Sequence, residues 1–540
     1  MDYCKAARMI NPRARPCAEG TIRSTPIVAG LSLSKKTWTL IAAILGTSTA
    51  FVDESVVNVA LPAIETDLGA SAAVAQWVIN AYTLCLSALL LIGGAAGDRY
   101  GRRRVFTAGS AIFAAASVWC AVAADLSQLV VARGVQGIGA ALLIPCSLAM
   151  IGATFEEAER GRAIGTWSGA AAIAGAIAPI LGGFMVDHAS WRMIFLINPF
   201  LAVPAILIAQ WHVTESRSLE AAAALDWFGA LLILAGLGML VAGVILAPHL
   251  GWTHPMIWGL LIAGVVLLSG FLAEASRSRA PLVPLELFRS RVFSGVNLLT
   301  LFLYGALGGA FFLIPFELIQ VHGYSATQTG AAFFPFTIIL GVLSRWSGGL
   351  LDRFGARLPL IVGPSIVALG FVLLALPGTG GTYWTTFFVP MAIVGFGMAV
   401  SVAPLTTTVM NAVDAQHTGI ASGINDAVAT MAGLLAVAIF GVVALQISAG
   451  ALDRELATAA LSAPARAALA GAQNTFVTEP ALGSLPSADR EIAAALIRQS
   501  LAAGIRAAFL LAAGLALAGA FCSAEMIKPK SARSQISEAK

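Results

Sequence analysis

The chain has 540 residues, of which 58% are hydrophobic and only 11% are charged. Soluble domains carry charges at roughly 25% of positions, so this composition excludes a soluble enzyme with an ordinary surface and indicates a membrane protein. The net charge of +4 is too small to predict a nucleic-acid partner, and the six cysteines contain no CxxC pair that would predict a metal site or a disulfide framework.

Fourteen apolar runs of about 20 residues, the length that crosses a bilayer, follow one another along the chain. Residues 1–36 contain seven basic side chains, and the run that follows is too long for a cleaved signal peptide. We therefore expect a cytoplasmic N-terminal tail followed by an all-α membrane protein. The expected spans lie near 37–62, 72–97, 104–124, 127–150, 161–184, 191–213, 226–247, 255–274, 292–320, 327–350, 358–377, 384–407, 417–446 and 502–525.

Basic residues gather in the even-numbered connections, whereas the short odd-numbered ones carry almost none apart from Arg192. The positive-inside rule then places the even-numbered connections and both termini in the cytoplasm of a multi-pass protein of the cell membrane. The long Ala-rich connection 447–500 is expected outside, as short amphipathic helices at the membrane surface. The basic clusters are Arg99 to Arg104, Arg160 and Arg162, Arg217, Arg277 and Arg279, Arg289 and Arg291, and Arg353 and Arg357.

An internal repeat is visible in the positions of glycines and charged turns. The turn that begins at Gly94 recurs 254 residues later at Gly348, and the glycines at 137 and 161 recur 258 residues later at 395 and 419. The near-constant offset indicates two duplicated halves, as in secondary transporters. We expect six-helix bundles at 37–213 and 292–525, two inserted helices with linkers at 214–291, and a cytoplasmic tail at 526–540.

Several motifs support this reading. They are Asp53-Glu54-Ser55-Val56-Val57-Asn58-Val59-Ala60-Leu61-Pro62, the turn Gly94 to Arg104, Arg133-Gly134-Val135-Gln136-Gly137, Ala178-Pro179-Ile180-Leu181-Gly182-Gly183, and Trp191-Arg192 through Asn198-Pro199. Together they resemble the major facilitator superfamily, specifically its fourteen-span drug:proton antiporters, although Ser55 replaces the usual Thr and Ala178 the usual Gly.

The resemblance covers nearly all of residues 37–525 and implies the major facilitator fold, with two six-helix bundles plus two inserted helices. It further implies alternating access, a proton gradient in place of any cofactor, and export of amphipathic or cationic drugs. The partners are then a small-molecule substrate, protons and the lipid bilayer, with protein partners left unspecified.

Two charged residues within the spans are the first candidates for coupling. A charge inside the bilayer costs at least about 2.5–3.5 kcal/mol, so each is a functional candidate by default. Asp53 lies about 13 Å from the outer end of its span and Arg133 about 9 Å from the same side, so the two can meet. Relative movement of their helices would then switch proton affinity. The alternative is a static ion pair.

For two other acidic residues, two roles stay open. Glu54 points about 100° away from Asp53 and either contacts substrate or packs against a polar neighbour. Asp426, about 13 Å into its span, either tunes the charge preference for substrate or forms an interhelical hydrogen bond. Glu317 and Arg345 are expected at the membrane interface.

The repeated turn and a glycine series complete the candidate sites. By resemblance, Asp98, Arg99, Gly101 and Arg102, with Asp352 and Arg353 in the second half, form a cytoplasmic gate that locks the halves when the cavity opens outward; a topology signal alone is the alternative. The antiporter motif contains Pro179, Gly182 and Gly183, and its two glycines permit close helix packing. The antiporter resemblance connects this segment to a seal against leak.

Other functional classes lack their signatures. The six histidines are scattered, so neither an intramembrane enzyme nor a metal site is predicted, and we find no GxxxxGK[ST] loop of an ATP-driven pump. The alternative that stays open is a proton-coupled carrier of a specific metabolite, siderophore or lipid, including an importer.

Overall fold

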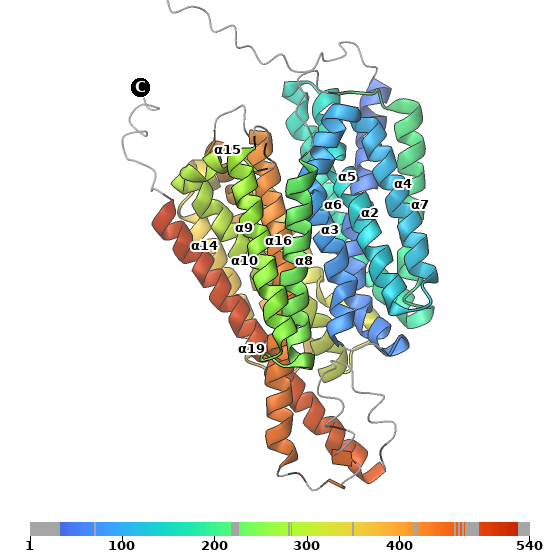
Figure 1. Ribbon diagram of the computed structural model, residues 1–540, viewed down its shortest axis with the longest axis vertical. Helices are drawn as coiled ribbons and strands as arrows, with labels where there is room; N and C mark the ends of the chain where they lie inside the picture. The colour runs from blue at the N-terminus through green and yellow to red at the C-terminus, as the bar shows by residue number, and fades with distance from the viewer. Residues whose placement is uncertain are drawn as a thin grey trace, which may run out of the picture.

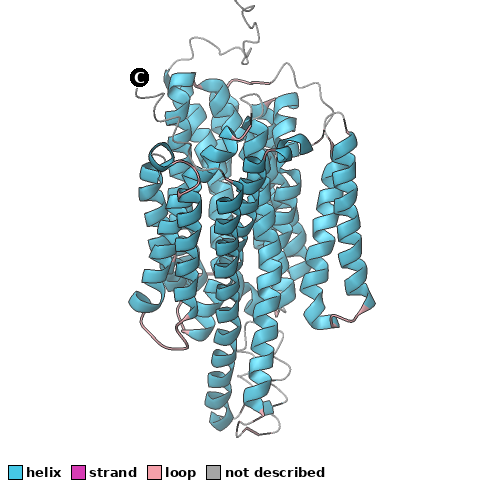
Figure 2. Cartoon of the chain, turned by 90° about the vertical axis from the view of Figure 1, so that its left-hand side faces the viewer, coloured by secondary structure: helices cyan, strands magenta, loops and turns pink. Residues whose placement is uncertain are grey.

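A computed structural model describes residues 33–69, 72–217, 226–278, 281, 283–347, 350–413, 418–457 and 487–527, with a few isolated positions between 459 and 485. Helices make up nearly all of this part of the chain, which contains no strand (Figures 1 and 2). Thirteen helical segments of the described chain are long and apolar enough to cross a membrane. A shorter apolar helix, Pro359–Ala375, occupies the predicted eleventh span. The all-α prediction is therefore confirmed.

The first half contains six long helices, and two more helices follow it before the second half begins. These are α2 (Leu33–Asp67), α3 (Ala72–Tyr100), α4 (Arg102–Val122), α5 (Leu126–Thr154), α6 (Glu157–His188) and α7 (Met193–His212), then α8 (Trp227–Leu250), α9 (Pro255–Arg277) and the short 3-10 helix η1 (Leu285–Arg289).

The second half is more broken, and two of its helical segments are π-helical. Its elements are α10 (Arg291–Phe316), η2 (Glu317–Val321), α11 (Ala326–Ala332), α12 (Phe334–Ser347), α13 (Leu350–Phe354), α14 (Pro359–Ala375), η3 (Trp384–Phe388), α15 (Val389–Asn411), α16 (Thr418–Leu456) and α19 (Ser487–Met526).

The two halves use the same helix pairs, as an internal repeat requires. In the first half α2 packs against α6 and α7, α3 against α5, and α4 against α5 and α7. In the second half α10 packs against α16 and α19, α12 against α15, and α14 against α15 and α19. These pairs match one to one when the spans are numbered within each half. The repeat inferred from glycine offsets is therefore present in the packing.

The inserted helices α8 and α9 pack against each other and lie across the line between the halves. Leu237 and Val241 of α8 share a buried apolar cluster with Leu84 of α3 and Leu434 of α16. Because α3 belongs to the first half and α16 to the second, α8 contacts both (Figure 1). The inserted pair thus covers one side of the interface between the halves and leaves the side of α6 and α11 uncovered.

Two elements differ from the sequence predictions for physical reasons. The tenth span is broken between α11 and α12, next to Pro335, because proline lacks an N–H and its ring clashes with the carbonyl of residue 331. The connection 447–500 does not form only short surface helices. Instead α16 continues to Leu456 and α19 begins at Ser487, so both project beyond the bundle (Figure 1). The alanine-rich sequence favours this continuation, since alanine is the strongest helix former.

The molecule has two distinguishable ends. Helix α2 begins and α19 ends at one of them, and the turn between α3 and α4 places Arg99 to Arg104 there too (Figure 1). We call this the basic end. The opposite end carries the projecting parts of α16 and α19 and the connection between α10 and α11. The predicted tail 1–36 lies outside the described residues except for its last four positions.

Candidate functional site

Asp53 lies in the middle of α2, which packs against α5 and α7, and it is only 2% exposed. Its carboxylate forms an ion pair with Arg133 of α5. The carboxylate oxygen Oδ1 accepts hydrogen bonds from Gln136 Nε2 and Asn198 Nδ2, each at 2.7 Å. Ser117 Oγ on α4 accepts from the same two amides at 2.8 and 3.2 Å. The carboxylate therefore joins α2 to α5 and α7, and the two amides extend this network to α4.

Arg133 is equally buried and is held from other directions as well. Its Nε donates to the Val78 carbonyl of α3 at 2.9 Å, and its Nη1 donates to Gln136 Oε1 at 2.6 Å. The guanidinium lies 4.4 Å from the ring centroid of Tyr82. A buried charge that loses its partner costs about 3–5 kcal/mol. The pair is therefore stable when both charges are in contact and shielded from water. It is also stable when the two charges are separated and each is hydrated.

The structure thus brings Asp53 and Arg133 together, as the sequence analysis expected. Sequence analysis did not single out Gln136, Asn198 and Ser117 as partners of the carboxylate. Gln136 and Asn198 are amides within apolar spans, which is a signal for a buried polar network. Ser117 gave no such signal, because a lone serine on a transmembrane helix most often bonds its own backbone, and Ser117 also donates to the Phe113 carbonyl at 2.8 Å.

Glu54 and Asp426 have the opposite environment from Asp53. Both side chains are exposed although each lies well inside a long helix that packs on several neighbours. Helix α2 contacts α10 and α11 of the second half, and α16 contacts α3 of the first half. Glu54 lies within electrostatic reach of Asp53 and Arg133, and Asp426 within reach of Tyr304 on α10. Each half therefore carries one exposed carboxylate on a helix that contacts the other half.

The charged turn at the basic end bonds within the first half. Arg102 donates from Nε and Nη2 to Asp98 Oδ1 at 3.0 and 2.8 Å, and from Nη1 to the Ala149 carbonyl of α5 at 3.3 Å. Gly101 has φ 109°, and a Cβ there would lie 2.7 Å from the Glu215 carboxylate. That carboxylate accepts from Arg103 N at 3.0 Å and so covers the start of α4. Hydrogen bonds within the turn and to α5 thus connect the end of α3 to the start of α4.

The remaining residues of the predicted gate are Arg99, Asp352 and Arg353. Arg99 and Arg353 are exposed, and each guanidinium lies over the aromatic ring that follows it in sequence, Tyr100 and Phe354. The side chain of Asp352 lies outside the described residues, as does that of Arg345.

At the opposite end the two halves are in direct backbone contact through α6 and α11. A Cβ on Gly183 of α6 would lie 2.2 Å from the Ala326 carbonyl oxygen, and a Cβ on Gly330 of α11 would lie 2.0 Å from the Pro179 carbonyl oxygen. Neither contact tolerates a side chain. Gly182 instead faces Val56 of α2, within its own half. The segment Pro179–Gly183 therefore packs against the second half and closes the opposite end.

Asp187 adds a polar link to this contact, and the sequence gave no indication of it. Its carboxylate accepts hydrogen bonds from the backbone N–H groups of Ala326 and Thr327 at 3.0 and 2.8 Å. A carboxylate of α6 thus caps the first turn of α11, where unpaired N–H groups favour negative charge. The closed opposite end is held by backbone packing and by this cap.

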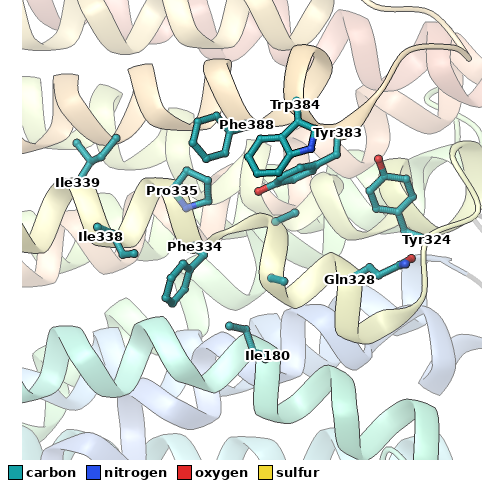
Figure 3. A pocket seen from close by; sticks show the side chains of 12 residues that line it. Ile180, Tyr324, Gln328, Phe334, Pro335, Ile338, Ile339, Tyr383, Trp384 and Phe388 are labelled. Atoms are coloured by element: carbon teal, nitrogen blue, oxygen red, sulfur yellow. The ribbon is translucent and has the colours of Figure 1, made fainter.

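A pocket of about 710 Å³ lies beside the contact between α6 and α11 (Figure 3). Ile180 lines it from the first half, and Phe334, Tyr324 and Trp384 line it from the second. Its walls are nearly all apolar or aromatic. The pocket therefore borders the closed end on the side that the inserted helices leave open.

The comparison with known families decides the class of the protein. The family model described as Major Facilitator Superfamily matches residues 43–437. The chain belongs to the major facilitator superfamily. It is 32% identical to the tetracenomycin C resistance and export protein of Streptomyces glaucescens, over 89% of this chain and 90% of that protein. It is 34% identical to the multidrug resistance protein Stp of Mycobacterium tuberculosis strain CDC 1551 / Oshkosh, over 75% of each chain.

The fold agrees with solved transporters. A bacterial homolog of the human lysosomal transporter Spinster, in an inward-facing and unoccupied conformation, superposes with a TM-score of 0.63 over 93% of this chain and all of that one. Sequence identity in this match is 18%, so the likeness concerns the fold alone. This major facilitator protein is a multi-pass membrane transporter of small molecules and not an enzyme.

Proposed function

We propose that this transporter exports amphipathic, cationic molecules from the cytoplasm in exchange for protons. The observation that carries the proposal is the buried Asp53–Arg133 pair, a titratable site within the helix bundle whose two charges belong to different helices. The exposed carboxylates of Glu54 and Asp426 support a cationic substrate, since each half presents one negative charge on a helix that contacts the other half. The names of the resistance and export relatives support the direction of transport.

The proposed transport cycle depends on which end of the molecule is closed. The contact between α6 and α11 closes the opposite end, and in the proposed cycle this conformation takes up substrate from the basic end. Proton entry from the other side would neutralise Asp53, weaken its pairing with Arg133 and allow α2 and α5 to shift. Substrate and proton then alternate, because each state of the pair suits only one of them.

The basic end is assigned to the cytoplasm by the positive-inside rule, and the projecting part of α16 and α19 to the outside. A single cysteine placed near position 475 is expected to react with an impermeant maleimide added to intact cells. The measurement is mass-tagging of the protein before and after the cells are opened. Labelling seen only from the cytoplasmic side would overturn both the orientation and the fourteen-span count.

The charged turn at the basic end should matter for gating. Asp98→Asn removes the charge that holds Arg102, and we expect transport to fall severalfold, with a bias toward the inward-facing state and near-normal abundance in the membrane. Asp125→Asn is the matched control, because Asp125 only caps α5 and asparagine caps equally well. Unchanged transport and unchanged accessibility in Asp98→Asn would mean that the turn serves topology alone.

The proposed activity is tested in everted membrane vesicles with ethidium as a cationic probe. Energised vesicles should accumulate the dye and should lose protons when the dye is added, and a proton uncoupler should abolish both. Uptake of an anionic or neutral metabolite with protons, and no response to ethidium, would favour the alternative of a dedicated metabolite carrier.

A further inference from the structure

Glu317 was expected to reach toward the membrane interface, but the structure buries it. It begins the π-helical turn η2, two residues after Pro315 at the end of α10. Its side chain is 7% exposed, and its Oε1 lies 3.5 Å from Nε2 of His322, whose side chain is 6% exposed. Both Glu317 Oε2 and His322 Nε2 are buried without a hydrogen-bond partner in the described part of the chain, so the 3.5 Å contact is within ion-pair distance but is not a hydrogen bond.

The surroundings of this pair are mostly aromatic. The His322 ring lies edge-on to Phe387 of η3 and to Tyr324, with centroids 5.1 and 6.3 Å apart. Tyr324 also lines the pocket beside the closed end, and it is labelled in Figure 3. The turn is packed by α10, α11 and α19, and Tyr324 and Tyr383 lie in the neighbouring connections. The titratable side chains on the packed helices are Arg291 and Tyr304 of α10, and Asp489, Arg490, Glu491, Arg498, Arg506, Cys522 and Glu525 of α19. The charged neighbour that acts on the Glu317 carboxylate is His322.

The pair is connected directly to the seal between the halves. Gly323 follows His322 with φ 70°, and Ala326, the first residue of α11, follows three residues later. The same Ala326 provides the carbonyl in contact with Gly183 and one of the N–H groups bound by Asp187. Movement of α11 away from α6 therefore pulls on the short segment that packs His322 over Glu317.

We propose that Glu317 and His322 form a second proton-binding site, which takes up one proton from the outside when the opposite end closes. Buried as they are, the two groups are stable with one shared proton and no net charge, because a single unpaired charge in such a place is expensive. When the opposite end opens, water reaches the pair, and it can lose the proton and remain as a hydrated carboxylate beside a neutral imidazole. Closure thus requires an external proton.

Closure of the opposite end should therefore depend on the external pH. In the proposed cycle the closed state binds one proton more than the open state. Closure is therefore favoured at low external pH and is lost as external pH rises. The ratio of open to closed protein should increase by at most about tenfold per pH unit, the limit for one proton.

The experiment measures this ratio by the distance between two spin labels. Labels at Ala189 after α6 and Thr379 before η3 are both exposed, lie at the opposite end and belong to different halves. The protein is purified in lipid nanodiscs from a variant whose six native cysteines are replaced. When the pH is raised from 6 to 8.5, protein with unaltered Glu317 and His322 should change from the shorter to the longer distance between the labels.

Glu317→Gln removes the charge that must be neutralised, so its distance distribution should not change with pH. His322→Gln leaves a lone carboxylate and should keep the opposite end open throughout this pH range. Glu491→Gln, an exposed glutamate on the projecting part of α19, is the matched control and should respond like the starting protein. A pH slope in Glu317→Gln equal to that of the control, or no slope in the starting protein, overturns the proposal. If Glu317→Gln does not fold, the proposal is overturned by a closed opposite end in His322→Gln at pH 8.5.

Discussion

Asp53→Asn is expected to abolish transport against a gradient while leaving substrate binding in place. An asparagine fits the space and keeps part of the hydrogen bonding to Gln136 and Asn198, but it cannot exchange a proton. Exchange of one proton for one monovalent cation moves no net charge, so the pH gradient drives it, and one pH unit supplies about 1.4 kcal/mol, enough for a roughly tenfold substrate gradient. Without it the accumulation ratio in energised everted vesicles should fall to about one, while exchange of labelled for unlabelled probe should continue.

This prediction needs a control for folding, because the single change leaves Arg133 buried without a counter-charge, at a cost of about 3–5 kcal/mol. The double variant Asp53→Asn with Arg133→Gln removes both charges and should regain stability without regaining accumulation. The two changes should be non-additive in thermal stability, since they share one interaction. If purified Asp53→Asn still releases protons on addition of substrate, as the unaltered protein should, the coupling site lies elsewhere, with Glu54 and Asp426 next to test.

Much of the architecture was predictable from the sequence because membrane helices follow simple rules. Apolar runs predicted most spans to within a few residues, except for the long extensions of α16 and α19 and the break between α11 and α12. The glycine offsets predicted two halves with matching helix pairs, which the packing shows. Depth along a helix also follows from counting residues, which is why Asp53 and Arg133 were expected to meet. These inferences depend on one coordinate only, the distance along the helix axis.

What the sequence did not predict depends on rotation about that axis and on contacts between distant segments. Counting residues cannot decide whether Asp53 or Glu54 faces the interior, and the exposed one is Glu54. Hydropathy does not distinguish an α-helical end from the π-helical turn that buries Glu317. The cap that Asp187 places on α11 joins residues about 140 positions apart, on helices whose pairing no local pattern encodes.

Gly183→Ala is expected to hold the transporter open at the opposite end and to stop transport. The added Cβ would lie 2.2 Å from the Ala326 carbonyl oxygen, a backbone atom that can yield only if α6 and α11 separate. Gly330→Ala places a Cβ 2.0 Å from the Pro179 carbonyl oxygen and should act in the same way from the other half. Reversing a closed-to-open ratio from about 99:1 to 1:99 takes about 5.5 kcal/mol, so even partial separation should be measurable.

The matched control is Gly169→Ala on the same helix, where a Cβ would have no atom within 4 Å. Spin labels at Ala189 and Thr379 should report the longer distance in Gly183→Ala and Gly330→Ala and the shorter one in the control, with equal amounts of protein in the membrane. Because either substitution alone already prevents closure, combining them should add little. Normal transport by Gly183→Ala, with the shorter distance retained, would show that the opposite end closes without this backbone contact and that the Asp187 cap holds it instead.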